Sequence, residues 1–477
     1  MADSKSELLA PGTKVHFMGI GGYGINPIAR VMHEMGYRIS GCDMNESPLI
    51  PPLVELGIPV RIGHSPDHID EFDLLPEDSA LVLSSAIPMT HPEVQAAYSQ
   101  GIRILKRNDV MRTVMKDKVG IAVAGTHGKT TTTAMIAVTL KELGLDPSYI
   151  IGGVPVDLGR NAKAGDGDHF VIEADEYDNM FLGIYPKVAI VTSLEFDHPD
   201  QFEDIDEVRR LFQRFIANVK EDGLVLAAHD VAQSRRLIKR RMLTGQSAIT
   251  YGMSGGSWRA RDVKPNEHGG MDFNIVYLGF EVGRVSLRVP GIHNVQNALV
   301  AVAAITEVTE IKAKEVAEAL SNFRGVQRRF ELKGEVNGVV VIDDYAHHPT
   351  AIRSTLDAAR RRYPGKTIWA VWQPHTYSRT AKLLDDFVDS FSAADHVIVT
   401  DIFRSRDKDT FELNGAQVVD KMAHHPDAKH ISGLTEATAY LSETVKSGAV
   451  VIVMSAGDAT RISSDLVFSL QERTVAS

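Results

Sequence analysis

Short runs of hydrophobic, mostly β-branched residues alternate with helix-length amphipathic segments along almost the whole chain. Nine such runs are found, at residues 15–20, 81–87, 119–125, 169–175, 188–193, 338–344, 367–373, 396–401 and 449–455. Strands that are buried on both faces of a parallel sheet have this continuous apolar pattern, so the alternation predicts an α/β fold. Residues 246–290 instead combine alternation with glycine and turn residues, which predicts a small antiparallel insertion.

The strand series begins again at two places, just before residue 119 and near Arg324. No repeat of fixed period and no linker of biased composition marks either place. The length of 477 residues is enough for three domains at roughly 150 residues each. We therefore expect an N-terminal domain in residues 1–115, a central domain in 116–323 and a C-terminal domain in 324–477.

Composition excludes several classes of protein. The net charge is -11, so non-specific binding of nucleic acid, which needs clustered Lys and Arg, is not expected. Cys42 is the only cysteine, which by composition excludes an internal disulfide framework, a cysteine-ligated zinc site and a thiol relay. The first residues lack a signal-peptide pattern and no run reaches the ~20 apolar residues of a membrane span, so we expect a cytoplasmic protein without membrane insertion.

The first hydrophobic run leads into a glycine motif, GIGGYG at residues 19–24. A Gly-x-Gly-x-x-Gly turn between a strand and a helix lets a diphosphate approach the backbone at the helix N-terminus. Asp43 follows Gly24 by 19 residues, where a ribose-binding acid is expected. The motif predicts a bound nucleotide, and both NAD and a UDP group fit it. The following helix is expected to bury Ile25, Ile28, Met32 and Met35.

A second phosphate-binding motif, GTHGKTTTT, follows the run at 119–125 and precedes a helix expected over residues 134–143. In such a loop the backbone amides surround the phosphates, Lys129 reaches the β- and γ-phosphates, and the Thr130 hydroxyl ligates Mg²⁺. A standard loop has a glycine at the position of Val123, so this one is shortened. The motif predicts binding of a nucleoside triphosphate.

Acidic residues follow the next two strands. One group contains Glu173, Asp175, Glu176 and Asp178, and the other contains Glu195, Asp197, His198 and Asp200. Several acids at one strand end need a cation or solvent to offset their charge. We therefore expect a metal ion beside the phosphate loop, with His198 as a ligand.

Further motifs carry polar side chains suited to ligand binding. Asn294 and Asn297 lie three residues apart at an expected helix start, where their amides can read a purine edge. A pair of arginines, Arg328 and Arg329, forms the second motif, and an acidic and histidine-rich segment with Asp343, Asp344, His347 and His348 follows another strand. The next strand is followed by His375, Ser378 and Arg379, a basic and hydroxyl-rich loop that suits a carboxylate or a phosphate.

Taken in order, these motifs resemble those of the Mur ligase family. The matching segments are HFMGIGGYG, GTHGKTTTT, EADEYD, EFDHPD, HNVQNA, RRFE, DDYAHHP and QPHTYSRT. The resemblance covers nearly the whole chain. It implies an N-terminal Rossmann-like domain that binds UDP, a central ATPase domain with a mostly parallel sheet, and a C-terminal Rossmann-like α/β domain.

The resemblance is strongest to the alanine-adding branch of the family. It implies an ATP-dependent ligase that joins L-alanine to the lactyl carboxylate of UDP-N-acetylmuramate through an acyl phosphate, with ATP as co-substrate and two Mg²⁺ ions. We expect a monomer or a weak homodimer.

The resemblance also implies roles for single residues. Lys129, Glu173 and His198 would be catalytic, and Thr130, Glu173 and His198 would hold metal. The ATP site would comprise Gly125, Thr126, His127, Gly128, Lys129, Thr130, Thr131, Asn294, Asn297, Arg328 and Asp344. The UDP-substrate site would comprise Gly19, Gly21, Gly22, Gly24, Asp43 and Ser84. The amino-acid pocket would comprise His348, His375 and Arg379.

Three other functions stay open. The EADEYD segment, with Tyr177, also resembles the murein tripeptide ligase of cell-wall recycling, which shares the ATP residues and differs in its nucleophile. An NAD-dependent dehydrogenase fits the first glycine motif but not the Gly-Lys-Thr loop. A non-catalytic nucleotide-binding protein leaves the two acidic groups and His198 without a role.

Overall fold

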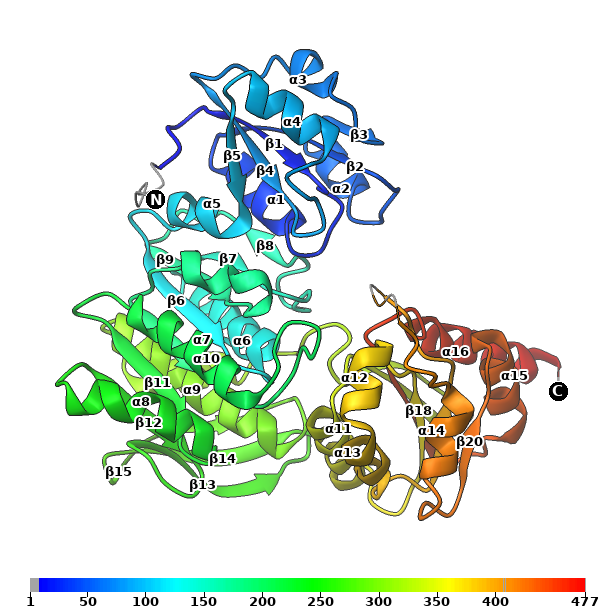
Figure 1. Ribbon diagram of the computed structural model, residues 1–477. Helices are drawn as coiled ribbons and strands as arrows, with labels where there is room; N and C mark the ends of the chain where they lie inside the picture. Colours follow the sequence, from blue (N-terminus) through cyan, green and yellow to red (C-terminus); the bar gives the residue numbers. More distant parts are fainter. Residues whose placement is uncertain (1–7, 406, 408, 477) are drawn as a thin grey trace.

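The computed structural model describes residues 8–405, 407 and 409–476, and its α/β fold confirms the predicted class. Three units follow one another along the chain (Figure 1), with the N-terminal unit at the top, the central unit below it and the C-terminal unit at the right. Their sheets lie within residues 14–106, 119–286 and 331–454. Each sheet falls inside one of the predicted domains, whose boundaries stay predictions.

The N-terminal sheet has five parallel strands in the order β3-β2-β1-β4-β5, which is the order of a nucleotide-binding half of a Rossmann fold. Ligands of such sheets bind at the carboxyl ends of the strands, where the order reverses beside β1. The strands are β1 (Lys14–Met18), β2 (Arg38–Asp43), β3 (Val60–Ile62), β4 (Ser79–Leu83) and β5 (Arg103–Lys106). The helices are α1 (Asn26–Glu34), α2 (Pro51–Glu55), α3 (His68–Glu71), α4 (Pro92–Ser99) and α5 (Arg107–Val114).

The central sheet has ten strands in the order β15-β14-β13-β12-β11-β10-β6-β9-β7-β8. The stretch from β13 to β7 is parallel, and antiparallel pairs stand at both edges. The strands are β6 (Val119–Ala124), β7 (Ser148–Ile150), β8 (Ala162–Lys163), β9 (His169–Glu173), β10 (Val188–Val191), β11 (Leu224–Ala228), β12 (Ala248–Gly252), β13 (Trp258–Pro265), β14 (Met271–Tyr277) and β15 (Phe280–Ser286). The helices are α6 (Lys129–Glu142), η1 (Tyr177–Gly183), α7 (Ile205–Ala217), α8 (Ala232–Leu243), α9 (Ile292–Val308) and α10 (Ala313–Leu320).

The C-terminal sheet has six strands in the order β16-β17-β21-β18-β19-β20, parallel except for β16. The strands are β16 (Glu331–Val336), β17 (Val339–Asp344), β18 (Thr367–Trp372), β19 (His396–Val399), β20 (Ala428–His430) and β21 (Ala449–Met454). The helices are α11 (Pro349–Arg362), α12 (Tyr377–Lys382), α13 (Leu384–Val388), η2 (Asp389–Phe391), α14 (Gly415–Lys421), α15 (Leu434–Thr444) and α16 (Thr460–Ala476).

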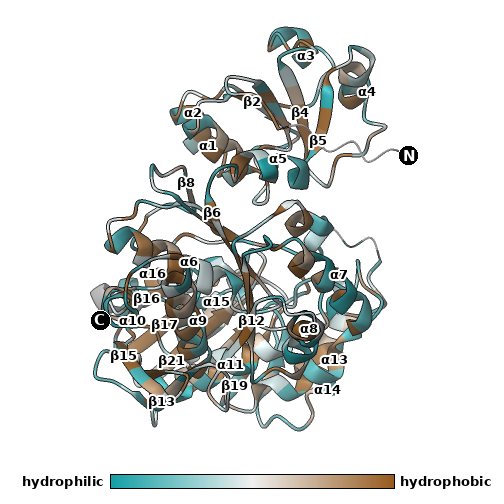
Figure 2. Ribbon diagram, turned by 90° about the vertical axis from the view of Figure 1, so that its left-hand side faces the viewer, coloured by the Kyte–Doolittle hydropathy of each residue, from teal (hydrophilic) through white to brown (hydrophobic). Residues whose placement is uncertain are grey.

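The strands lie where the hydrophobic runs predict them because helices cover both faces of each sheet. Every residue of β17 and β21 is buried. In Figure 2 brown segments gather in the interior of the units, whereas many outer helices and loops are teal. Central helix α9 is buried from Asn294 to Ile305, apart from Gln296, and packs against α6. No helix in the described part of the chain is both long enough and apolar enough to cross a membrane.

Two local predictions are wrong. Helix α6 begins at Lys129 rather than at residue 134, because Gly128 adopts a left-handed conformation and starts the helix at once. Met35 lies beyond the end of α1 and is 38% exposed, so it does not belong to the buried face. The antiparallel structure predicted for residues 246–290 is present as β13 to β15, but β12 pairs with β11 in parallel and all these strands extend the central sheet.

Candidate active site

The loop between β6 and α6 has the geometry of a phosphate-binding loop. Gly128 is the N-cap of α6 with φ +79°, and no described side chain caps the helix. The N–H groups of the first helical turn lack carbonyl partners within the helix, so this end of α6 attracts an anion. The ring of His127 lies next to the loop and faces Glu195, with Nε2 3.3 Å from Oε2.

Lys129 is held at the mouth of this loop. Its ammonium donates to the Gly125 carbonyl at 2.6 Å and to Glu176 Oε2 at 2.9 Å. Burial alone would lower the pKa of Lys129, but Glu176, Asp175 and Glu173 outweigh burial and raise this pKa. The side chain is therefore charged and available to a phosphate.

Thr130 and Glu173 lie together, as a shared metal ligand set requires. The Thr130 hydroxyl donates to Glu173 Oε1 at 2.9 Å, and the Gly152 N–H donates to Oε2 at 2.6 Å. Neighbouring ligands of an octahedral Mg²⁺ with bonds of about 2.1 Å lie at nearly this separation, and Mg²⁺ prefers such oxygen ligands. Burial, only partly offset by the charge of Lys129, raises the pKa of Glu173.

His198 lies on the other side of Lys129. Its Nε2 is 3.8 Å from Glu176 Oε1, and its Nδ1 is buried without a hydrogen-bond partner among the described residues. The ring nitrogen that faces Glu176 is Nε2, and an imidazole beside a carboxylate is a pair of groups that can hold a divalent cation. A second cation would therefore lie beside Glu176 and be held through Nε2 of His198.

Asn294 and Asn297 lie behind the phosphate loop, at the start of α9. A Cβ on Gly128 would be 2.6 Å from Asn297 Oδ1, so this amide is in contact with the loop. Asn297 Nδ2 donates to Asn294 Oδ1 at 3.1 Å, and Asn294 Nδ2 donates to the Pro290 carbonyl at 2.7 Å. The two amides thus support the loop, and their contact with adenine stays a prediction.

The two adjacent arginines turn to different partners. Arg329 Nη2 donates to the Thr130 hydroxyl at 3.2 Å and so reaches the phosphate loop from the C-terminal unit. Arg328, which the sequence favours, has φ +59° and donates to the Ser455 carbonyl at 2.7 Å. The sequence named both arginines as candidates and the resemblance assigned Arg328 to the ATP site, but the two side chains point apart and it is Arg329 that reaches Thr130.

Asp344 uses both carboxylate oxygens within its own unit. Oδ2 accepts from the Phe330 N–H at 2.7 Å, and Oδ1 accepts from the Ala346 N–H at 2.8 Å. Burial raises the pKa of this carboxyl group. Asp344 therefore fixes the backbone at Phe330 and Ala346, near the start of the C-terminal unit. Its contact with the ATP ribose stays a prediction.

A buried ion pair joins the C-terminal unit to the central unit. Arg379 on α12 donates from Nε to Asp197 Oδ1 at 2.8 Å, and its Nη1 lies 3.1 Å from His375 Nδ1. Burial would raise the pKa of Asp197, but the Arg379 charge holds it well below its usual value. The structure thus brings the predicted residues Arg379 and His375 to the second acidic group.

His348 makes a second bridge between these units. Its Nε2 lies 3.3 Å from the Phe196 carbonyl, and its Nδ1 accepts from the Thr350 N–H at 3.3 Å. Burial, with the nearby His127, lowers the pKa of His348 to about 4. Neighbouring Glu195 accepts from the Thr350 hydroxyl at 2.7 Å, and its pKa is lowered to about 2 because hydrogen bonds outweigh burial. His348 is therefore neutral at pH 7.

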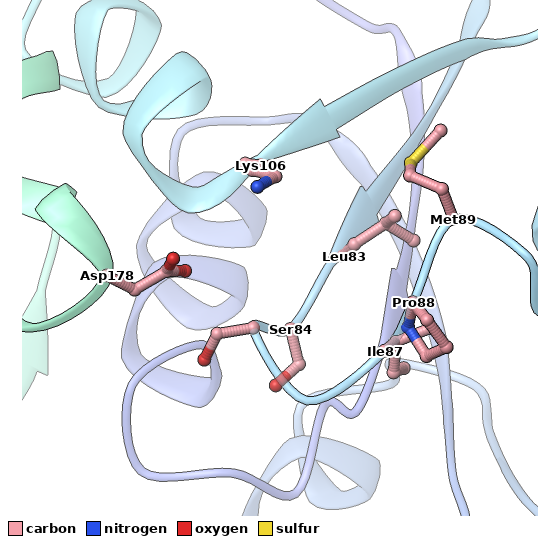
Figure 3. Close-up of a pocket in the computed structure, with 8 residues that line it drawn as sticks. Leu83, Ser84, Ile87, Pro88, Met89, Lys106 and Asp178 are labelled. Carbon is pink, nitrogen blue, oxygen red and sulfur yellow. The ribbon is translucent and has the colours of Figure 1, made fainter. Parts of the chain in front are cut away.

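A cavity of about 210 Å³ lies where the N-terminal unit meets the central unit. Figure 3 shows the predicted Ser84 and two residues that sequence reasoning did not assign to this site, Lys106 and Asp178, beside one space. The other lining residues are Leu83, Ser85, Ile87, Pro88 and Met89. A lysine at the strand end gives this mostly uncharged cavity a site for an anion.

The glycine loop adjoins this cavity. A Cβ on Gly19 would come within 2.8 Å of Ser84 Cβ, and Gly21 N–H donates to Asp43 Oδ2 at 2.9 Å. The guanidinium of buried Arg107 lies directly against Gly24, and its Nη2 donates to the Tyr177 carbonyl at 3.4 Å. Sequence reasoning missed Arg107, whose only signal is the Lys-Arg pair after β5. Gly22 donates to the Gly19 carbonyl, which keeps the turn tight.

These features define a class of protein. The C-terminal unit contacts the phosphate loop and the second acidic group of the central unit, and a cavity beside the nucleotide-type glycine loop lies between the N-terminal and central units. Such an arrangement is typical of a multidomain enzyme that uses a nucleoside triphosphate to activate a second bound substrate.

Comparisons with known proteins identify the family. Three family models match in order: "Mur ligase family, catalytic domain" at residues 14–119, "Mur ligase middle domain" at 123–305, and "Mur ligase, glutamate ligase domain" at 328–457. The chain belongs to the Mur ligase family.

Similar proteins cover nearly the whole chain. A UDP-N-acetylmuramate–L-alanine ligase of Alkaliphilus metalliredigens is 39% identical over 446 residues, which are 93% of this chain and 95% of that protein. The enzyme of the same name from Syntrophotalea carbinolica is 38% identical, covering 96% and 98%. Among solved structures, a UDP-N-acetylmuramate-alanine ligase from Thermotoga maritima is 28% identical with a TM-score of 0.78, covering 97% and 100%. A murein peptide ligase from Psychrobacter arcticus is 26% identical with a TM-score of 0.69, covering 96% and 99%.

Proposed function

We propose that this chain joins L-alanine to the lactyl carboxylate of UDP-N-acetylmuramate, with cleavage of ATP to ADP and phosphate, in peptidoglycan precursor synthesis. The observation that carries the proposal is the contact of the C-terminal unit with the phosphate loop and the second acidic group of the central unit, made by Arg329 to Thr130 and by Arg379 to Asp197. Relatives named for this activity align over more than nine-tenths of the chain and support it.

A carboxylate must be activated before an amine can attack it. Attack of a lactyl carboxylate oxygen on the γ-phosphorus of ATP forms an acyl phosphate and releases ADP. The amino nitrogen of L-alanine then attacks the acyl carbon, with loss of a proton from nitrogen and departure of phosphate, and an amide remains. Lys129 and Arg329 supply fixed positive charge where the phosphoryl oxygens gain negative charge, which is the main stabilising effect in such a transfer.

Thr130 and Glu173 would hold one Mg²⁺, and His198 would hold a second. Bound Mg²⁺ supplies positive charge to the phosphate oxygens and fixes their geometry. Glu176, between Lys129 and His198, keeps both side chains at the loop.

The N-terminal unit would bind the UDP part of the substrate. Arg107 against Gly24 and Lys106 in the adjoining cavity place two cations where a diphosphate and a sugar would lie. Asp178 brings the central unit to the same cavity, so a substrate bound there reaches toward the phosphate loop. A site for two nucleotide substrates supports a cytoplasmic location, where ATP is made and used.

The test is release of ADP from ATP and Mg²⁺ in the presence of UDP-N-acetylmuramate, with L-alanine, glycine, L-serine, the wall tripeptide or no amine. We expect turnover that requires both the UDP-sugar and L-alanine. Turnover that is independent of the UDP-sugar would contradict the proposal.

A murein tripeptide ligase is the second candidate. The similar structure from Psychrobacter arcticus favours it, as does Tyr177, whose ring lies 5.3 Å from that of His198. Turnover only with the tripeptide in the same assay would establish this alternative. Tyr177, beside His198, would then be the first residue to substitute, to test whether it determines which amine is accepted as the nucleophile.

A further inference from the structure

Five ligand-type side chains converge inside the N-terminal unit, and none of them has a role in the site described above. They come from five separate segments, β1, β2, the loop after β3, α3 and the start of α4. The residues are His16, Cys42, His64, His68 and Glu93. The side chains of His16 and Glu93 are fully buried, and those of His64 and His68 are 7% and 8% exposed.

Four of these groups have the spacing of a tetrahedral metal site. His16 Nε2 lies 3.4 Å from Cys42 Sγ and 3.4 Å from Glu93 Oε1. Cys42 Sγ is 3.4 Å from Glu93 Oε1, which is 3.1 Å from His68 Nδ1. The four ligand atoms all lie within 4.8 Å of one another. Around Zn²⁺, with bonds of about 2.0 Å to nitrogen or oxygen and 2.3 Å to sulfur, neighbouring ligands are about 3.3 to 3.6 Å apart.

The charges of the four groups also match a divalent cation. A Cys42 thiolate and a Glu93 carboxylate carry two negative charges, and two neutral imidazoles add none. An unneutralised pair of buried anions would be strongly unfavourable, whereas the pair with a divalent ion is neutral. The combination of thiolate, imidazole and carboxylate suits Zn²⁺ rather than Mg²⁺ or Ca²⁺.

Further hydrogen bonds orient these ligands. His16 Nδ1 lies 2.8 Å from the Ser40 hydroxyl, which directs Nε2 to the cluster. Glu93 Oε2 accepts from the Ser65 N–H at 3.1 Å, which leaves Oε1 facing the other groups. His64 Nδ1 is 3.0 Å from Cys42 Sγ, where an N–H can stabilise a thiolate. Such outer contacts are typical of metal ligands.

We propose that His16, Cys42, His68 and Glu93 bind one structural Zn²⁺ ion in the N-terminal unit. This proposal reverses the expectation from composition, which excluded a cysteine-ligated zinc site because the sequence has a single cysteine. One cysteine is sufficient when two histidines and a glutamate complete the four ligands.

The backbone of Cys42 links the proposed zinc site to the glycine loop of the nucleotide site. The Cys42 carbonyl accepts from the Gly19 N–H at 2.7 Å and from the Ile20 N–H at 3.1 Å. Asp43, the next residue, accepts from the Gly21 N–H. Fixing Cys42 therefore fixes the glycine loop, so zinc removal is expected to lower the melting temperature and to weaken binding of a uridine diphosphate compound.

The first test is elemental analysis of the full chain, made without a polyhistidine tag and purified without chelator. About one zinc per chain is expected. Protein treated with a chelator is then titrated with Co²⁺, which should produce a thiolate-to-cobalt charge-transfer band. Because the chain has one cysteine, this band can arise only at Cys42.

Variants separate this site from the ATP site. Cys42→Ser should abolish the charge-transfer band and the retained zinc, while His268→Ala, a control at a histidine that is 60% exposed in the central unit, should keep both. Wild-type protein that purifies without zinc and gives no band on Co²⁺ titration would overturn the proposal and leave the cluster as a hydrogen-bonded network. Full zinc retention in Cys42→Ser would also overturn it. The wild-type measurements decide the question even where a variant fails to fold.

Discussion

At the scale of the residue, Lys129 is the side chain on which phosphoryl transfer most depends. Lys129→Ala removes a fixed cation from the phosphate loop, so kcat should fall about 10²- to 10³-fold, the usual effect of losing one preorganised group. Binding of the UDP-sugar should persist, because the glycine loop belongs to another unit. Release of ADP and calorimetric binding of the UDP-sugar measure the two effects.

Two further lysine variants serve as controls for Lys129→Ala. Lys163→Ala removes a surface lysine that pairs with Asp146, and it should leave turnover unchanged. Lys129→Arg keeps a positive charge beside the buried Glu176 and separates lost catalysis from a lost ion pair. Normal ADP release by Lys129→Ala would rule out the assigned role.

Asp343 predicts a stability change that depends on pH. Burial raises the pKa of Asp343 to about 6, and its Oδ1 has no partner among the described residues. With a pKa of about 4 when unfolded, the native state binds the extra proton between these values, so stability falls as pH rises through this window. Asp343→Asn removes the free-energy cost of burying a charged carboxylate at this position. Its melting temperature should exceed that of the wild type at pH 8 and lose this advantage near pH 4; a difference that is constant with pH would contradict the expectation.

The arginine pair shows where residue-scale prediction from sequence ends. Two adjacent arginines match a sequence motif equally well. The backbone conformation at Arg328, with φ +59°, decides which of the two side chains reaches Thr130. The zinc cluster is a stronger example, because its ligands are spread from His16 to Glu93 without a spacing motif. Only the fold of β1, β2, α3 and α4 brings them together.

At the scale of the element, the start of α6 depends on the glycine that precedes it. Gly128→Ala places a Cβ 2.6 Å from Asn297 Oδ1 and strains a backbone with φ +79°. Gly144, just past the end of the same helix, has φ +78°, and a Cβ added there would meet nothing within 4 Å. Both alanine variants should lose about 1 to 2 kcal/mol of stability from the left-handed backbone, whereas only Gly128→Ala should lose ATP affinity.

Thermal unfolding and binding of a fluorescent ATP analogue measure these two effects. Equal ATP affinity in the Gly128→Ala and Gly144→Ala proteins would mean that contact between the loop and α9 is unimportant for nucleotide binding.

The strands of this structure were predicted from the sequence more completely than the contacts of single residues. Each of the nine hydrophobic runs overlaps a strand. A strand that is buried on both faces is apolar at nearly every position, so its sequence is easily recognised. The exposed edge strand β3, at Val60–Ile62, gives no such signal. The place of β13 to β15 in the central sheet depends on pairing with β12, which local sequence does not encode.

At the scale of the whole molecule, the Arg379–Asp197 pair holds the C-terminal unit against the acidic groups. Arg379→Met leaves Asp197 buried without its cation, and Asp197→Asn leaves Arg379 unpaired, so each should lower kcat/KM for L-alanine. The double variant should be no worse than either single variant, because the pair acts as one contact. Arg353→Met, which changes an arginine bonded only within its own unit to Asp386 and Ser390, should behave like the wild type.

Steady-state kinetics of these four proteins, with melting temperatures for comparison, measure the coupling. Fully additive losses would mean that the two residues do not act through their contact, and the association of the two units would then depend on other contacts.

The most direct test of the account is the fate of oxygen in the lactyl carboxylate. UDP-N-acetylmuramate labelled with ¹⁸O in that carboxylate is turned over with ATP, Mg²⁺ and L-alanine, and the released phosphate is analysed by mass spectrometry. Attack of the carboxylate on the γ-phosphorus predicts that each phosphate carries one oxygen from the substrate. Unlabelled phosphate would show that water, not the carboxylate, attacks ATP, and would contradict the assignment of a carboxylate-activating ligase.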